Sequence, residues 1–259
     1  TSGVHAVGVA AGLGRSLQSP HMSLDPTIVA TAIDAVLAAG AIHRAHYARE
    51  IRISKKSAID LVTDVDLEVE ACLRRLIGER CPGHVILAEE GDADVAGHGI
   101  RPGWCWVLDP LDGTTNFAHG LPQFAVSLGV EFDGQAVFGA VYDAMRGELF
   151  TAERGVGAFL NGERIRVSST FQLIDALLCT GFPYDVLTHV DELVHLFGQF
   201  LRRARAVRRL GSASLDLCYV AAGRFDGFWE AHLKPWDTCA GALVVTEAGG
   251  SVTTWDGEP

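Results

Sequence analysis

The chain has 259 residues, of which 48% are hydrophobic and 20% are charged, and this composition excludes a disordered or fibrous protein. Its length accommodates one large α/β unit or two closely packed halves. The formal net charge of −11 argues against a nucleic-acid partner, because surfaces that bind phosphate backbones carry an excess of Lys and Arg.

Three features of the sequence indicate where in the cell the protein is expected: its cysteines, its hydropathy and its first residues. The 6 cysteines are scattered without a CxxC pair, so we expect reduced thiols and a cytoplasmic location. We find no apolar run of about 18 residues and expect no membrane span. Residues 1–21 lack the pattern of a secretory signal and precede a His-Met junction typical of cloning sites, so we expect them to be a cloning-derived tail.

Two helices are expected in the first third of the chain. The first covers residues 24–49, where Asp25 is suited to the N-cap and Pro26 to the first helical position. The second is indicated by apolar residues that recur at helical spacing from 65 to 77, and it ends at the Cys-Pro-Gly of residues 81–83.

The following segments are typical of β-structure. Short apolar runs at 84–90 and 104–110 end in acids, as buried strands do when their last residues reach the edge of a sheet. Residues 124–167 alternate between polar and apolar and are interrupted by Asp-Gly, Arg-Gly and Asn-Gly turn signals. This pattern predicts an antiparallel meander.

The last third alternates between strand and helix patterns, which together with the first part predicts mixed layers of helix and sheet. Strands are expected at 176–180 and 225–230, and helices at 189–204, 214–222 and 236–248. We find no internal repeat or flexible linker. We therefore expect only a soft division near residue 170, between an N-terminal half at 22–170 that carries a metal site and a C-terminal half at 171–259.

The segment WVLDPLDGTTNF, residues 106–117, contains the strongest chemical signal. An isolated DxxD pair is more often two solvated loop acids or a helix N-cap. Here apolar residues precede Asp109, so we expect this acid to leave a buried strand, and Pro110 stiffens the backbone before Asp112. Two carboxylates that face the same point repel each other and require a cation between them.

The residues around this pair support a site for a metal and an anion. Gly113 lets the backbone approach a ligand, and Thr-Thr-Asn can begin a helix whose free N–H groups attract an anion. Glu89, Glu90 and Asp237 lie at the ends of other apolar runs. Oxygen ligands without a matching His or Cys cluster favour magnesium, manganese or calcium over zinc.

Five segments together resemble the inositol monophosphatase family of magnesium-dependent, lithium-sensitive phosphatases: DLVTDVD (60–66), AEE (88–90), WVLDPLDGTTNF (106–117), GSASLDLCYVAAG (211–223) and PWDTCAGALVVTEAGG (235–250). The resemblance extends from about residue 25 onward. It implies an α/β (α+β) fold, a layered αβαβα sandwich of the sugar-phosphatase type with mixed and antiparallel sheets. It also implies one continuous catalytic unit and a homodimer.

The chain departs from the family pattern in two places. Cys239 stands where a small alanine is common, and we expect this change to affect packing only. Members of the family usually continue some tens of residues beyond the EAGG motif, so we expect the C-terminus to be truncated.

The resemblance also implies a role for each matching residue. Two or three Mg²⁺ ions would be held by the side chains of Glu89, Asp109, Asp112 and Asp237 and the carbonyl of Leu111, with Asp109 bridging. Glu89, Thr114 and Asp66 would be catalytic, the last two as a hydroxyl–carboxylate pair that orients the attacking water. The amides of Gly113 and Thr114 would bind phosphate, and Asp112, Ala213 and Glu230 would contact the alcohol.

Several of these residues also have simpler interpretations. Asp66 can be a first-turn helix acid, Glu90 a solvated or supporting residue, and Glu230 an acid that only ends a strand. Trp104, Trp106 and Trp236 are more typical of packing walls than of ligand contacts. The segment LRRARAVRRL, residues 201–210, is most simply a solvated helix face running into a strand, and a basic lip of the site or a dimer contact are alternatives.

The expected activity is hydrolysis of a small phosphorylated substrate by a magnesium-dependent phosphomonoesterase, with direct attack by water and myo-inositol 1-phosphate as the first choice. Histidinol phosphate, fructose 1,6-bisphosphate and 3'-phosphoadenosine 5'-phosphate are alternatives within the superfamily. A different class of function, an interaction protein that retains the phosphatase fold, also remains open. We expect neither a nucleic-acid nor a membrane partner.

Overall fold

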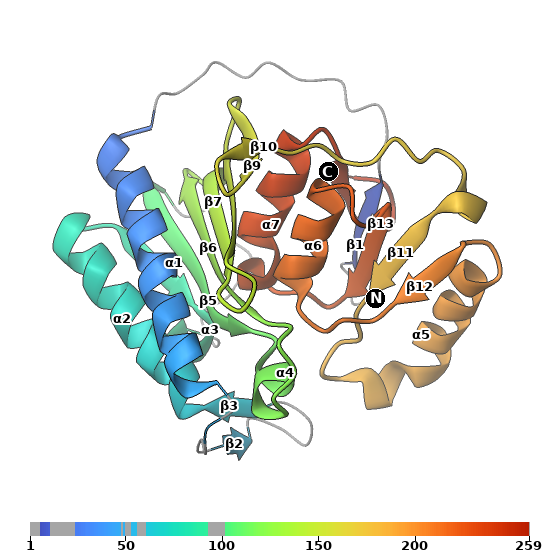
Figure 1. Cartoon of the computed structure of the whole chain (residues 1–259), viewed down its shortest axis with the longest axis horizontal. Helices are drawn as coiled ribbons and strands as arrows, with labels where there is room; N and C mark the ends of the chain where they lie inside the picture. The colour runs from blue at the N-terminus through green and yellow to red at the C-terminus, as the bar shows by residue number, and fades with distance from the viewer. Residues whose placement is uncertain are drawn as a thin grey trace.

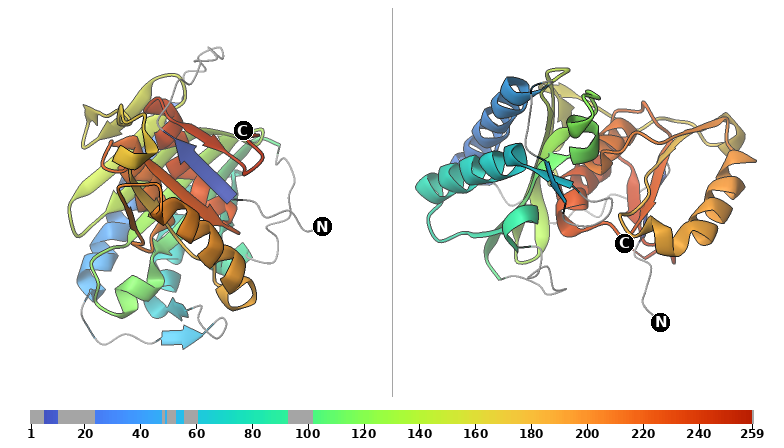
Figure 2. Two further views of the ribbon diagram at one scale, coloured as in Figure 1. Left: turned by 90° about the vertical axis from the view of Figure 1, so that its right-hand side faces the viewer. Right: turned by 90° about the horizontal axis from the view of Figure 1, so that it is seen from below.

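The computed structural model describes residues 6–10, 24–47, 49, 53–55, 61–92 and 102–258. Five layers alternate between helix and sheet (Figure 1), which confirms the predicted αβαβα sandwich. Figure 2 shows the first two helices at one end of the molecule and α5 at the other. The main helices are α1 (Pro26–His46), α2 (Asp64–Arg80), α5 (Val186–Leu201), α6 (Ala213–Ala221) and α7 (Pro235–Glu247), and the short ones are α3 (Glu89–Asp92) and α4 (Thr114–Ala118).

Helices α1 and α2 begin at the residues that the sequence indicated. The Thr27 N–H donates to Asp25 Oδ1 over 2.8 Å, so Asp25 is the N-cap of α1. Thr63 caps α2 in a capping box with Asp66, and α2 ends at Cys81. Both helices pack one face against the first sheet and form an outer layer.

The larger sheet has seven strands in the order β10-β9-β8-β7-β6-β5-β4. Five of them form the predicted antiparallel meander, whereas β4 and β5 are parallel, with Ala88 paired to Leu108. The acids that follow Ala88 and Leu108 therefore come out at the same edge. The strands are β4 (Val85–Ala88), β5 (Trp104–Asp112), β6 (Ala125–Phe132), β7 (Gln135–Asp143), β8 (Glu148–Glu153), β9 (Gly157–Leu160) and β10 (Glu163–Arg164).

The smaller sheet has five strands in the order β12-β11-β13-β1-β14. The parallel pairs are β11–β12 and β11–β13, while β1 pairs antiparallel with both β13 and β14. Strand β1 comes from the segment that we expected to be a cloning-derived tail. The strands are β1 (Ala6–Ala10), β11 (Leu177–Thr180), β12 (Ala206–Arg208), β13 (Gly227–Ala231) and β14 (Ser251–Thr253), and a separate ribbon pairs β2 (Ile53–Lys55) with β3 (Leu61–Thr63).

Helices α6 and α7 lie between the two sheets and give the two halves of the chain a shared core. Ala125 and Phe150 from the first half pack in the same buried cluster as Leu217 and Val244 from the second half. Cys239 on α7 lies directly over Gly129 of β6, which is the packing role expected for this residue. The position of α7 is therefore fixed from the side of the larger sheet.

The length and composition of α1 would allow it to cross a membrane, although the sequence led us to exclude a span. The fold gives the reason for this composition. Ile28, Ala32, Ala35, Val36 and Ala39 are buried against the larger sheet, so the apolar residues of α1 serve as one wall of a core.

The close contact between β7 and α7 leads to a stability prediction. A Cβ at Gly139 would lie 2.9 Å from the carbonyl oxygen and 3.0 Å from the Cα of Ala240, so Gly139→Ala must displace the backbone of α7. We expect a loss of about 1–3 kcal/mol in the free energy of unfolding, measured in urea. Gly78 in α2 is the matched control: a Cβ there contacts nothing within 4 Å, so Gly78→Ala should stabilise by about 0.5–1 kcal/mol. Equal effects of the two changes would contradict the prediction.

Candidate functional site

The segment DPLD belongs to strand β5, which continues to Asp112, and does not leave the sheet at Asp109 as the sequence suggested. Its pairing with β6 shifts register between Asp109 and Asp112. Such an irregularity bends a strand and re-aims its side chains. The Leu111 N–H donates to Asp109 Oδ1 over 3.0 Å and fixes this carboxylate. Sequence reasoning missed the continuation because the apolar run that indicated the strand ends before Asp109.

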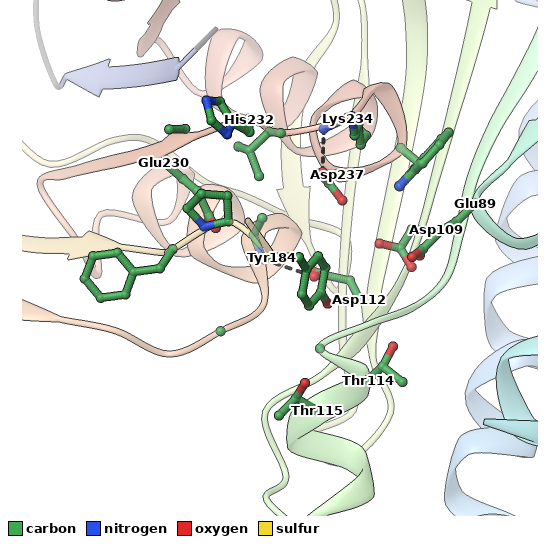
Figure 3. A pocket seen from close by; sticks show the side chains of 18 of the residues that line it. Glu89, Asp109, Asp112, Thr114, Thr115, Tyr184, Glu230, His232, Lys234 and Asp237 are labelled. Carbon is green, nitrogen blue, oxygen red and sulfur yellow. Dashed lines mark hydrogen bonds between the residues drawn. The ribbon is translucent and has the colours of Figure 1, made fainter. Parts of the chain in front are cut away.

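The structure brings the predicted site residues together around one pocket of about 690 Å³ (Figure 3). Asp66 is the exception, since it is fully buried behind Thr114 and does not line the pocket. The predicted residues that line the pocket are Glu89, Asp109, Leu111, Asp112, Gly113, Thr114, Ala213, Glu230 and Asp237.

The first turns of two helices place the outer carboxylates. Glu89 begins α3 directly after β4, and Asp237 is in the first turn of α7. The Lys234 N–H donates to Asp237 Oδ2 over 2.5 Å and holds this side chain. Figure 3 shows Glu89 and Asp109 side by side, with Asp237 directed into the same space.

Mutual repulsion and burial make this group of acids unstable as free anions. Burial first, and then Glu89, Asp112 and Asp237, raise the pKa of Asp109 well above its usual value. Burial, followed by the nearby Glu89 and Asp112, also raises the pKa of Asp237, against the opposing effect of the Lys234 N–H. Within the described part of the chain, Asp109, Asp112 and Asp237 form no ion pair with Lys or Arg. Oxygen donors in this arrangement fit hard divalent cations such as Mg²⁺.

Asp112 is held by the start of helix α6. Its Oδ2 accepts from Ser212 Oγ (2.6 Å), Ser214 N (2.8 Å) and Ser214 Oγ (2.5 Å), and its Oδ1 accepts from Ala213 N (3.1 Å). Burial raises the pKa of Asp112, and the hydrogen bonds from Ser212 and Ser214 oppose the shift. Because Oδ2 is saturated, Oδ1 is the oxygen that retains capacity for a cation. Sequence reasoning singled out Ala213 but missed both serines, although the GSAS motif before a helix was a signal.

Thr114 and Asp66 form the predicted hydroxyl–carboxylate pair. Thr114 Oγ1 lies 3.1 Å from Asp66 Oδ1 and 2.9 Å from the Leu111 carbonyl oxygen. A hydroxyl has one proton, so it donates to one of these acceptors at a time. Thr63 N and Thr63 Oγ1 donate to Asp66 Oδ2, which makes Asp66 a capping residue of α2 as well as the partner of Thr114.

Two further residues fix the backbone around the acids. The His43 ring lies at 0% exposure with Nε2 2.9 Å from the Pro110 carbonyl oxygen, and burial lowers its pKa to about 4, so Nε2 is a neutral N–H donor. No local motif signalled this contact. Gly113 has a φ of +96°, and a Cβ there would lie 2.9 Å from the Gln123 carbonyl oxygen, so only glycine fits. The first amides of α4 have no acceptor within the helix, and Gly113, Thr114 and Thr115 line the pocket.

Glu230 lies on the opposite side of the pocket from Glu89 and Asp109 (Figure 3). Burial, followed by the charge of Asp216, raises the pKa of Glu230 to about 8, while Arg209 opposes the shift. Its carboxyl group occupies the space where a side chain at Gly181 would begin. Glu230 therefore lines the pocket from within β13, and a pKa of about 8 keeps its carboxyl group mostly protonated at neutral pH.

Three other features that the sequence singled out lie in or near the pocket wall. The Glu90 N–H donates to Glu70 Oε2, and Glu90 does not line the pocket. Trp236 is 5% exposed and forms part of the pocket wall. The basic segment at 201–210 ends α5 and forms β12, and its Arg209 lines the pocket as a basic lip.

Comparisons with known proteins agree with this geometry. The sequence profile of the inositol monophosphatase family matches residues 25–259. Nus factor SuhB of Pseudomonas aeruginosa is 46% identical over 209 residues, 80% of this chain and 77% of the relative. Inositol-1-monophosphatase of Synechocystis is 44% identical over 229 residues, 88% and 79% of the two chains. The crystal structure of the extragenic suppressor protein suhB from Bartonella henselae superposes with a TM-score of 0.82 at 39% identity, covering 89% of this chain and 88% of that one.

The repulsion among the acids predicts a gain in stability when one charge is removed. The native-state pKa of Asp109 lies above its unfolded value, so the native protein binds more protons and loses stability as the pH rises above about 4. In chelator, Asp109→Asn should therefore raise Tm. If the change stabilises the protein by at least 1 kcal/mol, the rise should be at least about 2–4 °C. The gain should grow from pH 5 to pH 7.5.

Calorimetry with and without magnesium measures this effect. Magnesium should raise the Tm of the wild type and raise that of Asp109→Asn much less, because ligand binding stabilises only the state that binds. Asp191→Asn, which changes an exposed acid on α5, is the control and should leave Tm unchanged at both pH values. A lower Tm for Asp109→Asn in chelator would contradict the repulsion argument.

Proposed function

The chain belongs to the inositol monophosphatase family, and on this premise we propose that it is a magnesium-dependent phosphomonoesterase. The observation that carries the proposal is the group of acids from separate segments around one pocket, whose pKa values are raised by burial and mutual repulsion. Such a site repels a phosphate monoester, which carries a charge of about −1.5 to −2 at neutral pH, until cations neutralise it.

The oxygen donors divide into two sets that share Asp109. Glu89, Asp109 and the Leu111 carbonyl would hold one Mg²⁺, and Asp109, Asp112 and Asp237 a second, with a third ion held loosely at Glu89. When bound, these ions would lower the pKa of a water molecule and neutralise charge on the phosphate and the departing alcohol. With such ions no nucleophilic side chain is needed, so direct attack by water is the simplest mechanism.

The protein's own groups position the reactants. When Thr114 Oγ1 donates its proton to Asp66 Oδ1, its lone pairs accept a hydrogen bond from the attacking water. The buried Asp66 carboxylate can then receive a proton through this hydroxyl. The amides of Gly113 and Thr114 would donate to the phosphate oxygens, and Asp112, Ala213 and Glu230 would contact the alcohol portion.

We propose myo-inositol 1-phosphate as the preferred substrate, since the alcohol side of the pocket combines the polar groups of Glu230 and Arg209 with the wall of Tyr184. Histidinol phosphate, fructose 1,6-bisphosphate and 3'-phosphoadenosine 5'-phosphate remain the competing substrates. Inhibition by lithium and a homodimeric state are further parts of the proposal, taken from the family. Phosphate release measured across these substrates decides among them.

A second function is suggested by the relatives named Nus factor SuhB. In that case the chain would act through its surface as a protein factor, with or without phosphatase activity. The net charge of −11 favours a protein over a nucleic acid as the direct partner. The two functions are separable, because Asp109→Asn removes the chemistry and leaves the surface intact.

Loss of metal or of the shared carboxylate should abolish phosphate release. Excess chelator should remove activity, and magnesium should restore it. Asp109→Asn should lower kcat by at least about 10²–10³-fold, the cost of losing a key electrostatic group, while the variant stays folded by circular dichroism. Asp191→Asn is the control and should keep full activity. Normal turnover in chelator or in folded Asp109→Asn would refute the mechanism.

The raised pKa of Glu230 predicts a pH-dependent specificity effect. Below about pH 8 the neutral acid resembles glutamine, whereas above it the carboxylate is a charge-assisted acceptor, roughly twice as strong. Glu230→Gln should therefore cost little kcat/KM for inositol 1-phosphate at pH 7 and about 5–10-fold at pH 9. p-Nitrophenyl phosphate, which offers no hydroxyl, should show no such change, and histidinol phosphate tests a cationic alcohol. Equal losses on all substrates would instead assign Glu230 to structure or metal support.

A further inference from the structure

Two histidines and an aspartate from separate segments meet at the rim of the pocket. Asp185 is the N-cap of α5, His189 lies one turn later in the same helix, and His232 lies in the connection between β13 and α7. One ligand atom from each residue lies within 4.8 Å of the other two. No local motif groups these histidines, because His189 and His232 are 43 positions apart in the sequence.

Figure 3 shows His232 across the pocket from Glu89 and Asp109. Asp185 and His232 line this pocket on the side opposite the carboxylate site, and His189 lies beside them at its rim. Imidazole nitrogen favours zinc and other transition metals, whereas Mg²⁺ favours oxygen alone. The two sides of the pocket therefore differ in the metal that their ligands prefer.

Two of the three ligand-to-ligand distances are close to those around one tetrahedral ion, and the third lies within 4.8 Å. Zinc bonds of about 2.0–2.2 Å place neighbouring ligand atoms roughly 3.3 Å apart. His232 Nδ1 lies 2.9 Å from Asp185 Oδ2, and His189 Nε2 lies 3.7 Å from the same oxygen. Shifts of about 0.4 Å would bring both pairs to the tetrahedral spacing, which is within the freedom of half-exposed side chains.

A carboxylate lies behind one of the imidazoles. His189 directs Nε2 toward Asp185, and its other nitrogen, Nδ1, lies 3.8 Å from Glu192 Oε2. Histidines that bind metals usually donate their second N–H to a carboxylate, a carbonyl or water, which fixes the tautomer and strengthens the ligand. The Glu192 carboxylate lies near this nitrogen, but 3.8 Å is longer than a hydrogen bond, so Glu192 would have to move closer to take this supporting role.

The backbone at His232 adds an independent indication. His232 has a φ of +61°, in the left-handed region that costs a residue with a Cβ roughly 1–2 kcal/mol. Non-glycine residues in such conformations cluster at ligand sites and active sites. The rings of His232 and His189 also lie in edge contact, with centroids 5.1 Å apart.

We propose that Asp185, His189 and His232 form a second metal site that binds zinc, with a fourth position open to the pocket. The bound ion would tie the start of α5 to the connection that links Glu230 to Asp237, and would thereby brace the rim on which the alcohol portion of a substrate rests. This site is independent of the proposed phosphatase activity, because it is defined by zinc affinity.

A zinc titration tests the proposal. The protein is first stripped of metal and then saturated with magnesium, which fills the carboxylate site, and zinc is added in competition with a chromogenic chelator. The wild type should bind zinc at this site, and His189→Gln and His232→Gly should each lower its affinity by at least about tenfold. Glycine is suited to a φ of +61°, so His232→Gly removes the ligand without strain. His195→Gln, an exposed histidine further along α5, is the matched control and should leave zinc affinity unchanged.

Histidine imidazole NMR gives a second readout. One equivalent of zinc should fix His189 as the Nδ1–H tautomer and His232 as the Nε2–H tautomer, because they bind through the opposite nitrogens. Zinc binding that is unaffected by His189→Gln and His232→Gly but lost in Asp109→Asn would place the ion among the carboxylates and overturn the proposal. Absence of zinc binding, or unchanged imidazole spectra, would overturn it as well.

Discussion

Electrostatic repulsion among buried carboxylates is the constraint on which this structure depends. Burial raises the pKa values of Asp109, Asp112 and Asp237, and neighbouring carboxylates raise those of Asp109 and Asp237 further. A metal-free protein at neutral pH retains protons on these groups or tolerates their repulsion, and both reduce stability. The scaffold must therefore hold the acids against their own repulsion, and most of the unusual local geometry lies where it does so.

The chain holds each acid by a different device. Parallel pairing of β4 with β5 brings Glu89 beside Asp109, and the shifted register in β5 turns Asp112 toward the same pocket. Two serines at the start of α6 fix Asp112, and the Lys234 N–H fixes Asp237. Because these contacts come from both halves of the chain, the site forms only when α6 and α7 pack between the two sheets.

The rim and the floor of the pocket differ in burial and in the kind of donor atom that they offer. The floor consists of buried oxygen donors supported by backbone and hydroxyl hydrogen bonds, whereas the rim at Asp185, His189 and His232 is half exposed and carries nitrogen donors. The floor matches the motifs that identify the family. The rim depends on a histidine in a left-handed conformation, and no motif that we recognised in the sequence includes it.

The sequence by itself determined the elements whose signals are local. Caps and apolar spacing located α1 and α2, turn dipeptides located the meander, and the motif segments identified the residues that line the pocket. The tertiary structure alone decided the contacts between distant residues. His43 on Pro110, Ser212 on Asp112 and His232 on Asp185 join positions 67, 100 and 47 residues apart. Such contacts leave no periodic pattern in the sequence, because they arise only when separately formed layers pack together.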